Sequence, residues 1–471
     1  MVFNSASFLF MFLPAAVILE RVVPGRAAKN ALLCLLSAVF YAFGGLARVP
    51  VLLLAAVWNY LLGRLLAREV GRRKLWCCAA VLGDLGLLCV YKYLDFLLSA
   101  LGLPGLSRAL PVPLGISFFT FHAVSYAVDV YRDPALAEKN FGRFFLYLAF
   151  FPRLLAGPIV RWKEGRGQLC ERTVTAEDTA AGLRRFVRGM AKKLLLAESA
   201  AAVVNAVYAL DGASLSSGLA WLGAVGYCLQ IYYDFSGYSD MAIGLGRLFG
   251  FTFPENFDHP YASLSLSEFW RRWHMTLNRW FQDYLYFPLG GSRKGQARTV
   301  LNKLIVFFAT GLWHGAGWTF ILWGLWHGAL VSAEGLAKKP LERLSRRCVG
   351  RALLRLYTLL AVLLGFVMFR ASDLAQGWLM LSRLFSFTPA GLAAQLVCRS
   401  VLTPGRIGAL LLGAVFSLPA GPALRRLAAE KLGEGSPALE LAGDALALAG
   451  LFLCVLAMSG GGFSPFIYQQ F

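Results

Sequence analysis

"LIVFFATGLWHGAGWTFILWGLWHGAL", residues 304–330, consists almost wholly of aliphatic residues, aromatic residues and glycine, and its only ionisable side chains are His314 and His327. A run of this length exceeds the roughly 18–20 residues that a helix needs to cross the hydrocarbon core of a bilayer. The stretch therefore predicts a membrane protein, and it raises the question of what a histidine does in such surroundings.

The rest of the chain agrees with a membrane protein. Of its 471 residues, 58% are hydrophobic and 15% are charged, and the mean hydropathy is +0.60. We expect an all-α polytopic membrane protein with about ten or eleven transmembrane helices, several of them short or re-entrant. The other apolar runs are residues 7–19, 31–46, 49–66, 76–90, 114–130, 144–156, 219–233, 353–369, 407–416 and 441–458.

Basic residues gather in short links between the apolar runs, at residues 64–74, 184–193 and 338–355, and the formal charge is +20. In a soluble protein this excess would suggest nucleic acid, but here it indicates cytoplasmic loops, so we expect the lipid bilayer and no nucleic acid as a partner. Basic residues follow the first apolar run rather than precede it. This order predicts a retained helix with its N-terminus outside the cytoplasm, not a cleavable signal.

The sequence shows no repeat with a period of 20–50 residues and no long linker. We therefore expect one integral membrane domain over residues 1–471, with its core motifs in residues 227–328. The nine cysteines form no CxxC pair and have no metal-ligand spacing, so no metal site is expected.

Residues 265–291, "SLSEFWRRWHMTLNRWFQDYLYFPLGG", predict an interfacial amphipathic helix. Ser265 and Glu268 have the spacing of a capping box. The helix would lie in the membrane plane, with His274 at the border between its two faces, where the ring reaches both water and the protein interior. One face would carry Trp270, Trp273, Leu277, Trp280, Phe281 and Tyr284, and the other Arg271, Arg272, Asn278, Arg279 and Asp283.

His314 is predicted to lie deep in the membrane. It follows the basic residue Lys303 by eleven residues, which is roughly 17 Å of helix, close to the bilayer midplane. Either two half-length helices meet near Gly315 and Gly317, which permit a tight turn, or one long helix crosses. An ionisable group at that depth usually faces a bundle interior or a water-filled path and has a functional task.

A second group of polar residues interrupts an apolar helix in "LQIYYDFSGYSDMAIGLGRLFGF", residues 229–251, and these side chains either bond to one another or line a cavity. Arg153, in "FFPRLLAGPIV", lies beside a proline in an apolar setting. The candidate substrate-channel residues are Gln230, Asp234, Ser236, Tyr238, Arg153 and Trp313.

In the absence of a glycine-rich phosphate loop, paired carboxylates or a metal-ligand cluster, a histidine that accepts a proton is the strongest chemical candidate. Imidazole suits the deprotonation of a hydroxyl that attacks an activated acyl group, and exclusion of water would protect a thioester. The residues alone do not identify this reaction. A proton-coupled transporter or polysaccharide-export component would also use a midplane histidine, and a non-catalytic scaffold is a third alternative.

Long stretches of the chain resemble the membrane-bound O-acyltransferase family, in its bacterial alginate O-acetyltransferase branch. The "WRRWH" of residues 270–274 and the "WHG" of residues 313–315 lie within them. The stretches are "YYDFSGYSDMAIGLGRLFGFTFPENFDHPY", "SEFWRRWHMTLNRWFQDYLYFPLGGSRKG", "GLWHGAGWTFILWGLWHG", the opening "MVFNSASFLFMFLP", the run "AFFPRLLAGPIVR" and the terminal "PFIYQQF".

The resemblance implies a multi-helix fold with a thin core pierced by a channel, with His314 as the catalytic histidine and His274 as a second histidine on the cytoplasmic side. It implies a cytoplasmic acyl donor, acetyl-CoA or another thioester, without a bound cofactor. It further implies an extracytoplasmic partner of the serine-hydrolase-like type, a polysaccharide acceptor and a place in the bacterial cytoplasmic membrane. The related alternative is transfer of D-alanine from a carrier protein to teichoic acid.

Overall fold

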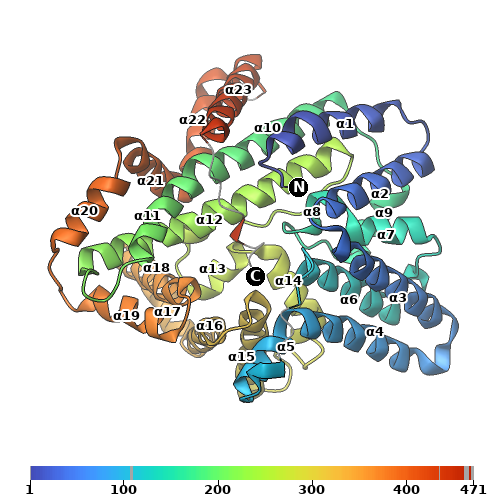
Figure 1. Ribbon diagram of the computed structural model, residues 1–471, viewed down its shortest axis with the longest axis horizontal. Helices are drawn as coiled ribbons and strands as arrows, with labels where there is room; N and C mark the ends of the chain where they lie inside the picture. Colours follow the sequence, from blue (N-terminus) through green and yellow to red (C-terminus); the bar gives the residue numbers. More distant parts are fainter. Residues whose placement is uncertain (1, 107–109, 434, 461–465, 468–471) are drawn as a thin grey trace. The chain divides into compact units, whose positions relative to one another are not determined.

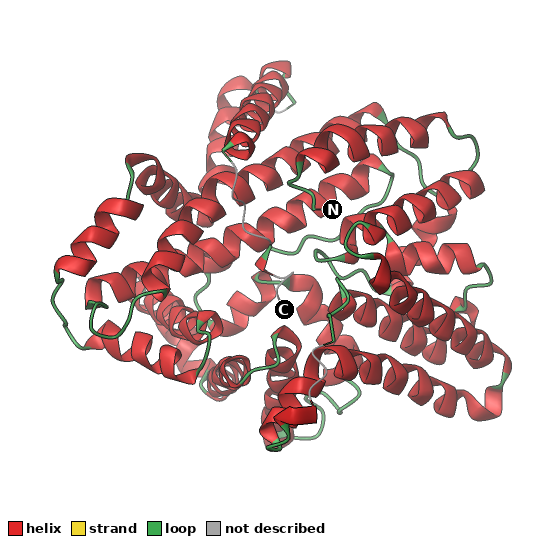
Figure 2. Cartoon of the chain, in the orientation of Figure 1, coloured by secondary structure: helices red, strands yellow, loops and turns green. Residues whose placement is uncertain are grey.

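The described chain consists of helices joined by loops, and no strand occurs in it (Figures 1 and 2). The computed structural model describes residues 2–106, 110–433, 435–460 and 466–467. Most of the terminal "PFIYQQF" therefore lies outside the described residues. The predicted all-α class is confirmed.

Contacts between residues divide the chain into two compact units, Met1–Phe186 with Ser239–Glu255, and Val187–Tyr238 with Asn256–Phe471. Two helices, α10 (Ala176–Ala191) and α12 (Ser217–Leu248), have their ends in different units. The expectation of a single membrane domain stays a prediction.

The first unit contains the N-terminal helices. Its α-helices are α1 (Leu13–Val22), α2 (Arg26–Ala42), α3 (Val49–Arg68), α4 (Arg73–Leu88), α5 (Leu94–Ala100), α6 (Ile116–Arg132), α7 (Phe141–Ala149), α8 (Phe151–Leu154) and α9 (Trp162–Cys170). Short 3₁₀ or π turns are η1 (Phe8–Phe12), η2 (Leu46–Arg48), η3 (Val70–Arg72), η4 (Cys89–Tyr93), η5 (Pro104–Leu106) and η6 (Pro134–Leu136).

In the first unit, α3, α4 and α6 pack against one another. Gly63 permits the close approach of α3 to α6, because a Cβ at this position would lie 2.2 Å from the hydroxyl of Tyr126. A second core is aromatic, with the ring of Phe151 at 5.3 Å from Phe12 and 5.6 Å from Phe40. The helices in the first 150 residues each carry an apolar face, and these contacts form where such faces pack against one another.

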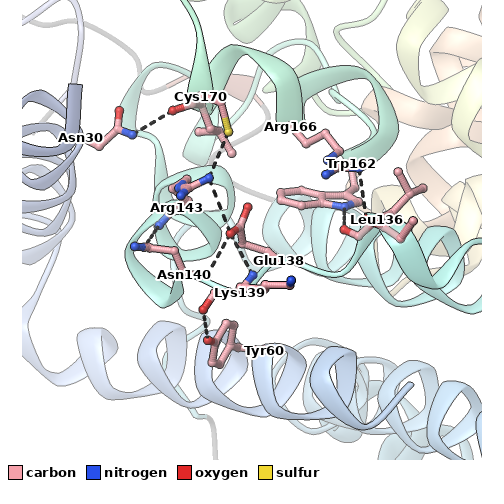
Figure 3. A network of polar contacts seen from close by, with 12 residues as sticks. Asn30, Tyr60, Leu136, Glu138, Lys139, Asn140, Arg143, Trp162, Arg166 and Cys170 are labelled. Atoms are coloured by element: carbon pink, nitrogen blue, oxygen red, sulfur yellow. Dashed lines mark hydrogen bonds and ion pairs between the residues drawn. The ribbon is translucent and has the colours of Figure 1, made fainter. Parts of the chain in front are cut away.

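A polar network fixes the link between α6 and α7 (Figure 3). Glu138 Oε1 accepts the backbone N–H groups of Lys139 and Asn140, each at 2.9 Å. Asn140 then caps α7 by accepting the N–H of Arg143 at 3.0 Å, and the Tyr60 hydroxyl donates to the carbonyl of Lys139 at 2.7 Å. Because the first N–H groups of a helix have no partner within it, this network sets where α7 begins.

The second unit contains the candidate catalytic motifs. Its α-helices after α12 are α13 (Leu266–Arg272), α14 (Met275–Phe281), α15 (Gln296–His314), α16 (Trp318–Leu336), α17 (Lys338–Ser345), α18 (Cys348–Arg370), α19 (Leu374–Phe385), α20 (Leu392–Val401), α21 (Pro404–Ser417), α22 (Ala420–Leu432) and α23 (Pro437–Ser459). The remaining elements are α11 (Glu198–Tyr208), η7 (Lys192–Ala197), η8 (Pro260–Ala262) and η9 (Gln282–Tyr286).

Four helices in the described part of the chain are long and apolar enough to cross a membrane: Leu46–Arg68, Arg73–Ala100, Cys348–Arg370 and Pro437–Ser459. Two bent pairs of helices raise this number to six if each pair is one span. The predicted number of about ten or eleven is larger, because several apolar runs belong to helices that are shorter or broken. Residues 144–156, for example, are divided between α7 and α8 at Phe150.

Candidate active site

His314 is the last residue of α15, and residues 315–317 join α15 to α16 as a helical hairpin (Figure 1). Two helices thus meet at "HGAG", as one of the two predicted geometries requires, but each has 19 residues and neither is half-length. The glycines were expected to permit a tight turn through their backbone freedom. This expectation is wrong, because Gly315 (φ −172°) and Gly317 (φ −165°) have an extended backbone that any residue can adopt. Gly315 is needed for space, since a Cβ there would lie 2.2 Å from the ring of Phe320.

The side chain of His314 is 2% exposed and packs among aromatic rings. The centroid of its ring lies 4.8 Å from Trp313, 5.0 Å from Trp323 and 5.2 Å from Phe369. These three rings come from α15, α16 and α18, and we call them the aromatic cage. The cage surrounds the imidazole with low-dielectric material, in which electrostatic interactions are stronger than in water.

His274 lies at a break in the chain, not on a helix face. The predicted continuous amphipathic helix is wrong here, because α13 ends at Arg272, Trp273 is extended, and His274 has a left-handed backbone (φ 44°) before α14 begins. Asn256 stabilises the break. Its carbonyl accepts the N–H of Met275 at 3.0 Å, and its Oδ1 lies 3.2 Å from His274 Nδ1.

The two faces of the predicted helix are separated in part, and the aromatic side contacts protein. Trp270, for example, packs against the rings of Phe307 and Trp323. Tyr284 of the aromatic face is half-buried, and so are Arg272, Asn278 and Asp283 of the polar face. The buried set is Trp270, Trp273, Leu277, Trp280 and Phe281, whereas Arg271 and Arg279 are exposed. The amphipathic pattern thus reports burial in the protein core.

His274 is 1% exposed, so the expectation that it reaches water is wrong. Burial lowers the pKa of its imidazole to about 3. At neutral pH the ring is therefore uncharged, and it can accept or donate a hydrogen bond but carries no positive charge.

Trp313 brings the two histidines together. Its ring centroid lies 4.8 Å from that of His314 and 6.0 Å from that of His274. His274 also packs against the Phe235 ring of α12, with ring centroids 4.6 Å apart and an angle of 86° between the ring planes. Residues separated by nearly 80 positions in the sequence thus form one continuous group of rings in the second unit.

The polar residues of α12 are buried. Asp234 pairs with Lys193, whose Nζ lies 2.5 Å from Asp234 Oδ1. Of the two predicted alternatives, this carboxylate therefore follows the first, in which the polar side chains bond to other protein groups. Neither Gln230 Oε1 nor Ser236 Oγ has a hydrogen-bond partner among the described residues. Tyr238 packs edge-on against Phe466. Of the candidate channel residues on α12, Gln230 and Ser236 therefore retain polar atoms that a substrate or water could use.

Arg153 belongs to the first unit, on α8, where it is buried. Its guanidinium donates to the carbonyls of Tyr147 and Val160 and stacks over the Tyr147 ring at 4.7 Å. It also lines a small pocket with Gln168 and Phe253. Its place as a substrate-channel residue stays a prediction.

Two further residues adjoin the candidate site residues: His327, and Lys193, which the sequence presented only as part of the basic link 184–193. His327 Nδ1 lies 3.4 Å from the indole Nε1 of Trp270, and its ring packs on Trp323, which also contacts His314. Two signals were available in the sequence: the repeated "LWHG" and the four-residue spacing of Trp323 and His327 on one helix face. For Lys193 the signal was a lysine that precedes the apolar run "LLLA".

No group of three or more His, Cys, Asp and Glu side chains that could hold a metal ion occurs in the described ranges. The polar groups near the histidines are their own imidazole nitrogens, the indole N–H groups and the polar side chains on α12.

Comparison with known proteins gives consistent results. The model of MBOAT, the membrane-bound O-acyltransferase family, matches residues 105–375, which include both histidines. The chain is 37% identical to the probable alginate O-acetylase of Azotobacter vinelandii, over 100% of both proteins. It is 34% identical to a peptidoglycan O-acetyltransferase of Helicobacter pylori, over 79% of this chain and 78% of that protein. It is 26% identical to a teichoic acid D-alanyltransferase of Bacillus subtilis, over 71% of this chain and 88% of that protein.

Proposed function

Because the chain belongs to the membrane-bound O-acyltransferase family and is a multi-pass membrane O-acyltransferase, we propose that it transfers acetyl groups for the O-acetylation of a cell-surface or exported polysaccharide. The donor is a cytoplasmic thioester, acetyl-CoA or an equivalent. The enzyme resides in the bacterial cytoplasmic membrane, and His314 is its catalytic base.

The observation that carries this proposal is the position of His314, at the tip of the α15–α16 hairpin within the aromatic cage. As general base, the imidazole removes the proton of an attacking hydroxyl while the hydroxyl oxygen forms a bond to the thioester carbonyl carbon. The carbon–sulfur bond breaks, and the departing thiolate takes the proton. Exclusion of water by the rings protects the thioester from hydrolysis.

His274 is proposed to orient the donor side of this site. Its ring is neutral and buried, and Trp313 lies between it and His314. The acyl acceptor is a hydroxyl of an extracytoplasmic serine-hydrolase-like partner, which passes the acetyl group to the polysaccharide, or a hydroxyl of the polysaccharide itself. The names of two relatives, an alginate O-acetylase and a peptidoglycan O-acetyltransferase, support a polysaccharide acceptor.

Transfer of D-alanine to teichoic acid is the second candidate, and the relative from Bacillus subtilis supports it. That relative is 26% identical over part of the chain, whereas the alginate O-acetylase is 37% identical over the full length. The acetyl donor is therefore the first choice.

The test replaces His314→Gln and measures base-labile acetate and D-alanine on envelope polysaccharide, in cells whose own copy has been deleted. Loss of a general base predicts a fall in ester formation of about 100-fold or more, with normal membrane insertion. His122→Gln is a matched control for the loss of a buried imidazole, because His122 is 1% exposed. Full ester formation by His314→Gln would refute the assignment, and released D-alanine without acetate would favour the second candidate.

A further inference from the structure

The short helix α13 carries the chain to His274, and its seven residues are too few for a helix to be stable by itself. Its position therefore depends on what its ends and its side chains contact. Ser265 Oγ accepts the N–H of Glu268 at 3.0 Å, as the predicted capping box requires. The N–H groups of Leu266 and Ser267, in the same first turn, need other acceptors.

A glutamate from another helix, Glu334 of α16, accepts both of these N–H groups. Its Oε1 lies 2.6 Å from Leu266 N, and its Oε2 lies 2.8 Å from both Ser267 N and Ser267 Oγ. Glu334 is 7% exposed, and a buried charge is stable only when it is paired and hydrogen-bonded. The positive end of the helix dipole also favours a carboxylate at this place. Glu334 thus caps α13 from outside the helix.

Lys303 of α15 supplies the opposite charge. Its ammonium attracts the Glu334 carboxylate and donates to the carbonyl of Val331 at 3.3 Å. A Cβ at Gly335 would lie 2.9 Å from Lys303 Nζ, so a glycine there leaves room for the ammonium. Both helices of the hairpin that carries His314 therefore contribute to the group that holds the start of α13.

A second contact between α16 and α13 lies two turns before Glu334. His327 Nδ1 accepts the indole N–H of Trp270, with 3.4 Å between the two nitrogen atoms. One turn further back, the ring of Trp323 lies 5.6 Å from that of Trp270 and 5.0 Å from that of His314. At about 100° per residue, the three residues of α16 fall within about 40° of one another. One stripe of α16 therefore contacts α13 and the ring of His314.

The far end of α13 is joined to the break at His274. The carbonyl of Trp270 accepts the side-chain amide of Asn278 in α14 at 2.9 Å, and the carbonyl of Arg272 accepts the N–H of Asp258 at 2.9 Å. These bonds tie α13 to the residues on both sides of the break. A shift of α13 along α16 would therefore displace His274 relative to His314.

We propose that Glu334 is a positioning residue. Together with His327 it fixes α13 against α16, and it thereby sets the place of the His274 ring relative to His314. We call the two contacts, at Glu334 and at His327, the α13 clamp. The effect on catalysis rests on the proposed function, whereas the clamp does not.

The clamp is tested with Glu334→Gln. The amide nitrogen of glutamine cannot accept a hydrogen bond, so the exchange removes the charge and one of the acceptors. Hydrogen–deuterium exchange of the peptide at residues 264–274, measured by mass spectrometry on the full-length protein in detergent, should become about tenfold faster or more. Trp270→Phe, which removes only the N–H donated to His327, should act in the same direction from the other contact.

The matched control is Glu342→Gln, because Glu342 is an exposed glutamate on α17, 3.9 Å from Lys338. It removes the same charge and should leave the exchange of residues 264–274 unchanged. Exchange of this peptide at the same rate in Glu334→Gln, Trp270→Phe and the unmodified protein would overturn the clamp.

The positioning role is tested by ester formation at matched protein abundance. We expect Glu334→Gln to lower the transfer rate about tenfold when His274 is present, and less than about twofold in a His274→Gln protein. A residue that acts through His274 loses its effect once His274 is replaced, whereas a general loss of stability lowers both rates alike. Equal losses in the two proteins would overturn the positioning role. If the unmodified protein forms no ester, the proposed function fails, while hydrogen exchange still decides the clamp.

Discussion

At the scale of single residues, the two candidate histidines are held in different ways. His314 is the last residue of α15, and its ring packs against the three rings of the aromatic cage. His274 occupies a left-handed backbone position that Asn256 stabilises through the neighbouring amide and through the ring nitrogen. We therefore expect His314 to matter for the chemical step, and His274 to matter for both geometry and stability.

The burial of His274 predicts a stability that depends on pH. Its pKa is about 3 in the folded protein and 6.5 ordinarily, so unfolding takes up a proton at intermediate pH. The stability that the protein gains from keeping this ring neutral is fully present above pH 6.5 and is lost as the pH falls toward 3. At about pH 5 the loss is about 2 kcal/mol. The measurement is thermal unfolding in detergent at neutral pH and at about pH 5. The melting temperature of His274→Asn should fall less between these two conditions than that of the unmodified protein.

The control for this exchange is His259→Asn, because His259 also has a left-handed backbone, with φ 43°. It separates the effect of asparagine at such a position from the effect of removing a buried imidazole. The same acid sensitivity in His274→Asn and the unmodified protein would contradict the prediction.

At the scale of secondary-structure elements, the α15–α16 hairpin depends on glycines where its helices cross. A Cβ at Gly324 would lie 2.3 Å from the carbonyl oxygen of Phe307, and one at Gly311 would lie 2.4 Å from the carbonyl oxygen of Phe320. Backbone oxygens cannot rotate away as a flexible side chain can. The hairpin that carries His314 is therefore set by these two close approaches.

Gly324→Ala should separate the two helices and destabilise the protein by about 1–3 kcal/mol, as overpacking of a close contact does. Gly317→Ala in the turn of the same hairpin should have little effect, since its nearest atoms are 3.5 Å or farther away and its φ is extended. Melting temperatures of the two variants in detergent compare them directly. Equal stability of the two would show that the crossing tolerates a methyl group.

At the scale of the whole molecule, the distribution of charge predicts topology. The basic clusters at residues 64–74, 184–192 and 338–355 should face the cytoplasm, whereas Lys193, which follows the second cluster, is buried. Cys170 and Cys348 are exposed and lie beside or within the polar and basic sections of the chain. Both thiols should therefore be cytoplasmic.

This topology is tested with a membrane-impermeant maleimide. Single-cysteine proteins that retain Cys170 or Cys348 should react in inverted vesicles and not in intact cells. The reporter for the opposite side is Ser7→Cys, since Ser7 is exposed and its segment is predicted to begin outside. Labelling of Cys348 in intact cells would place the basic cluster on the wrong side and contradict the predicted orientation.

The sequence by itself determined the helical class, the membrane setting, the family and the two histidines in their motifs. Hydrophobic runs and long motifs are local patterns, and local patterns can be recognised without knowledge of the fold. The amphipathic pattern of residues 265–284 likewise predicted the burial of Trp270, Trp273, Leu277, Trp280 and Phe281, although Tyr284 is only half-buried. It did not distinguish burial in protein from burial at the membrane surface.

Only the tertiary structure decided the break at His274, the aromatic cage and the hydrogen bond from Ile467 to Asp234. Each depends on groups that are far apart in sequence: Asn256 stabilises the break, Phe369 completes the cage, and Asp234 receives the N–H of Ile467. A local pattern contains no information on which distant group will satisfy a backbone amide or a buried charge, because the choice is made by packing of the complete chain.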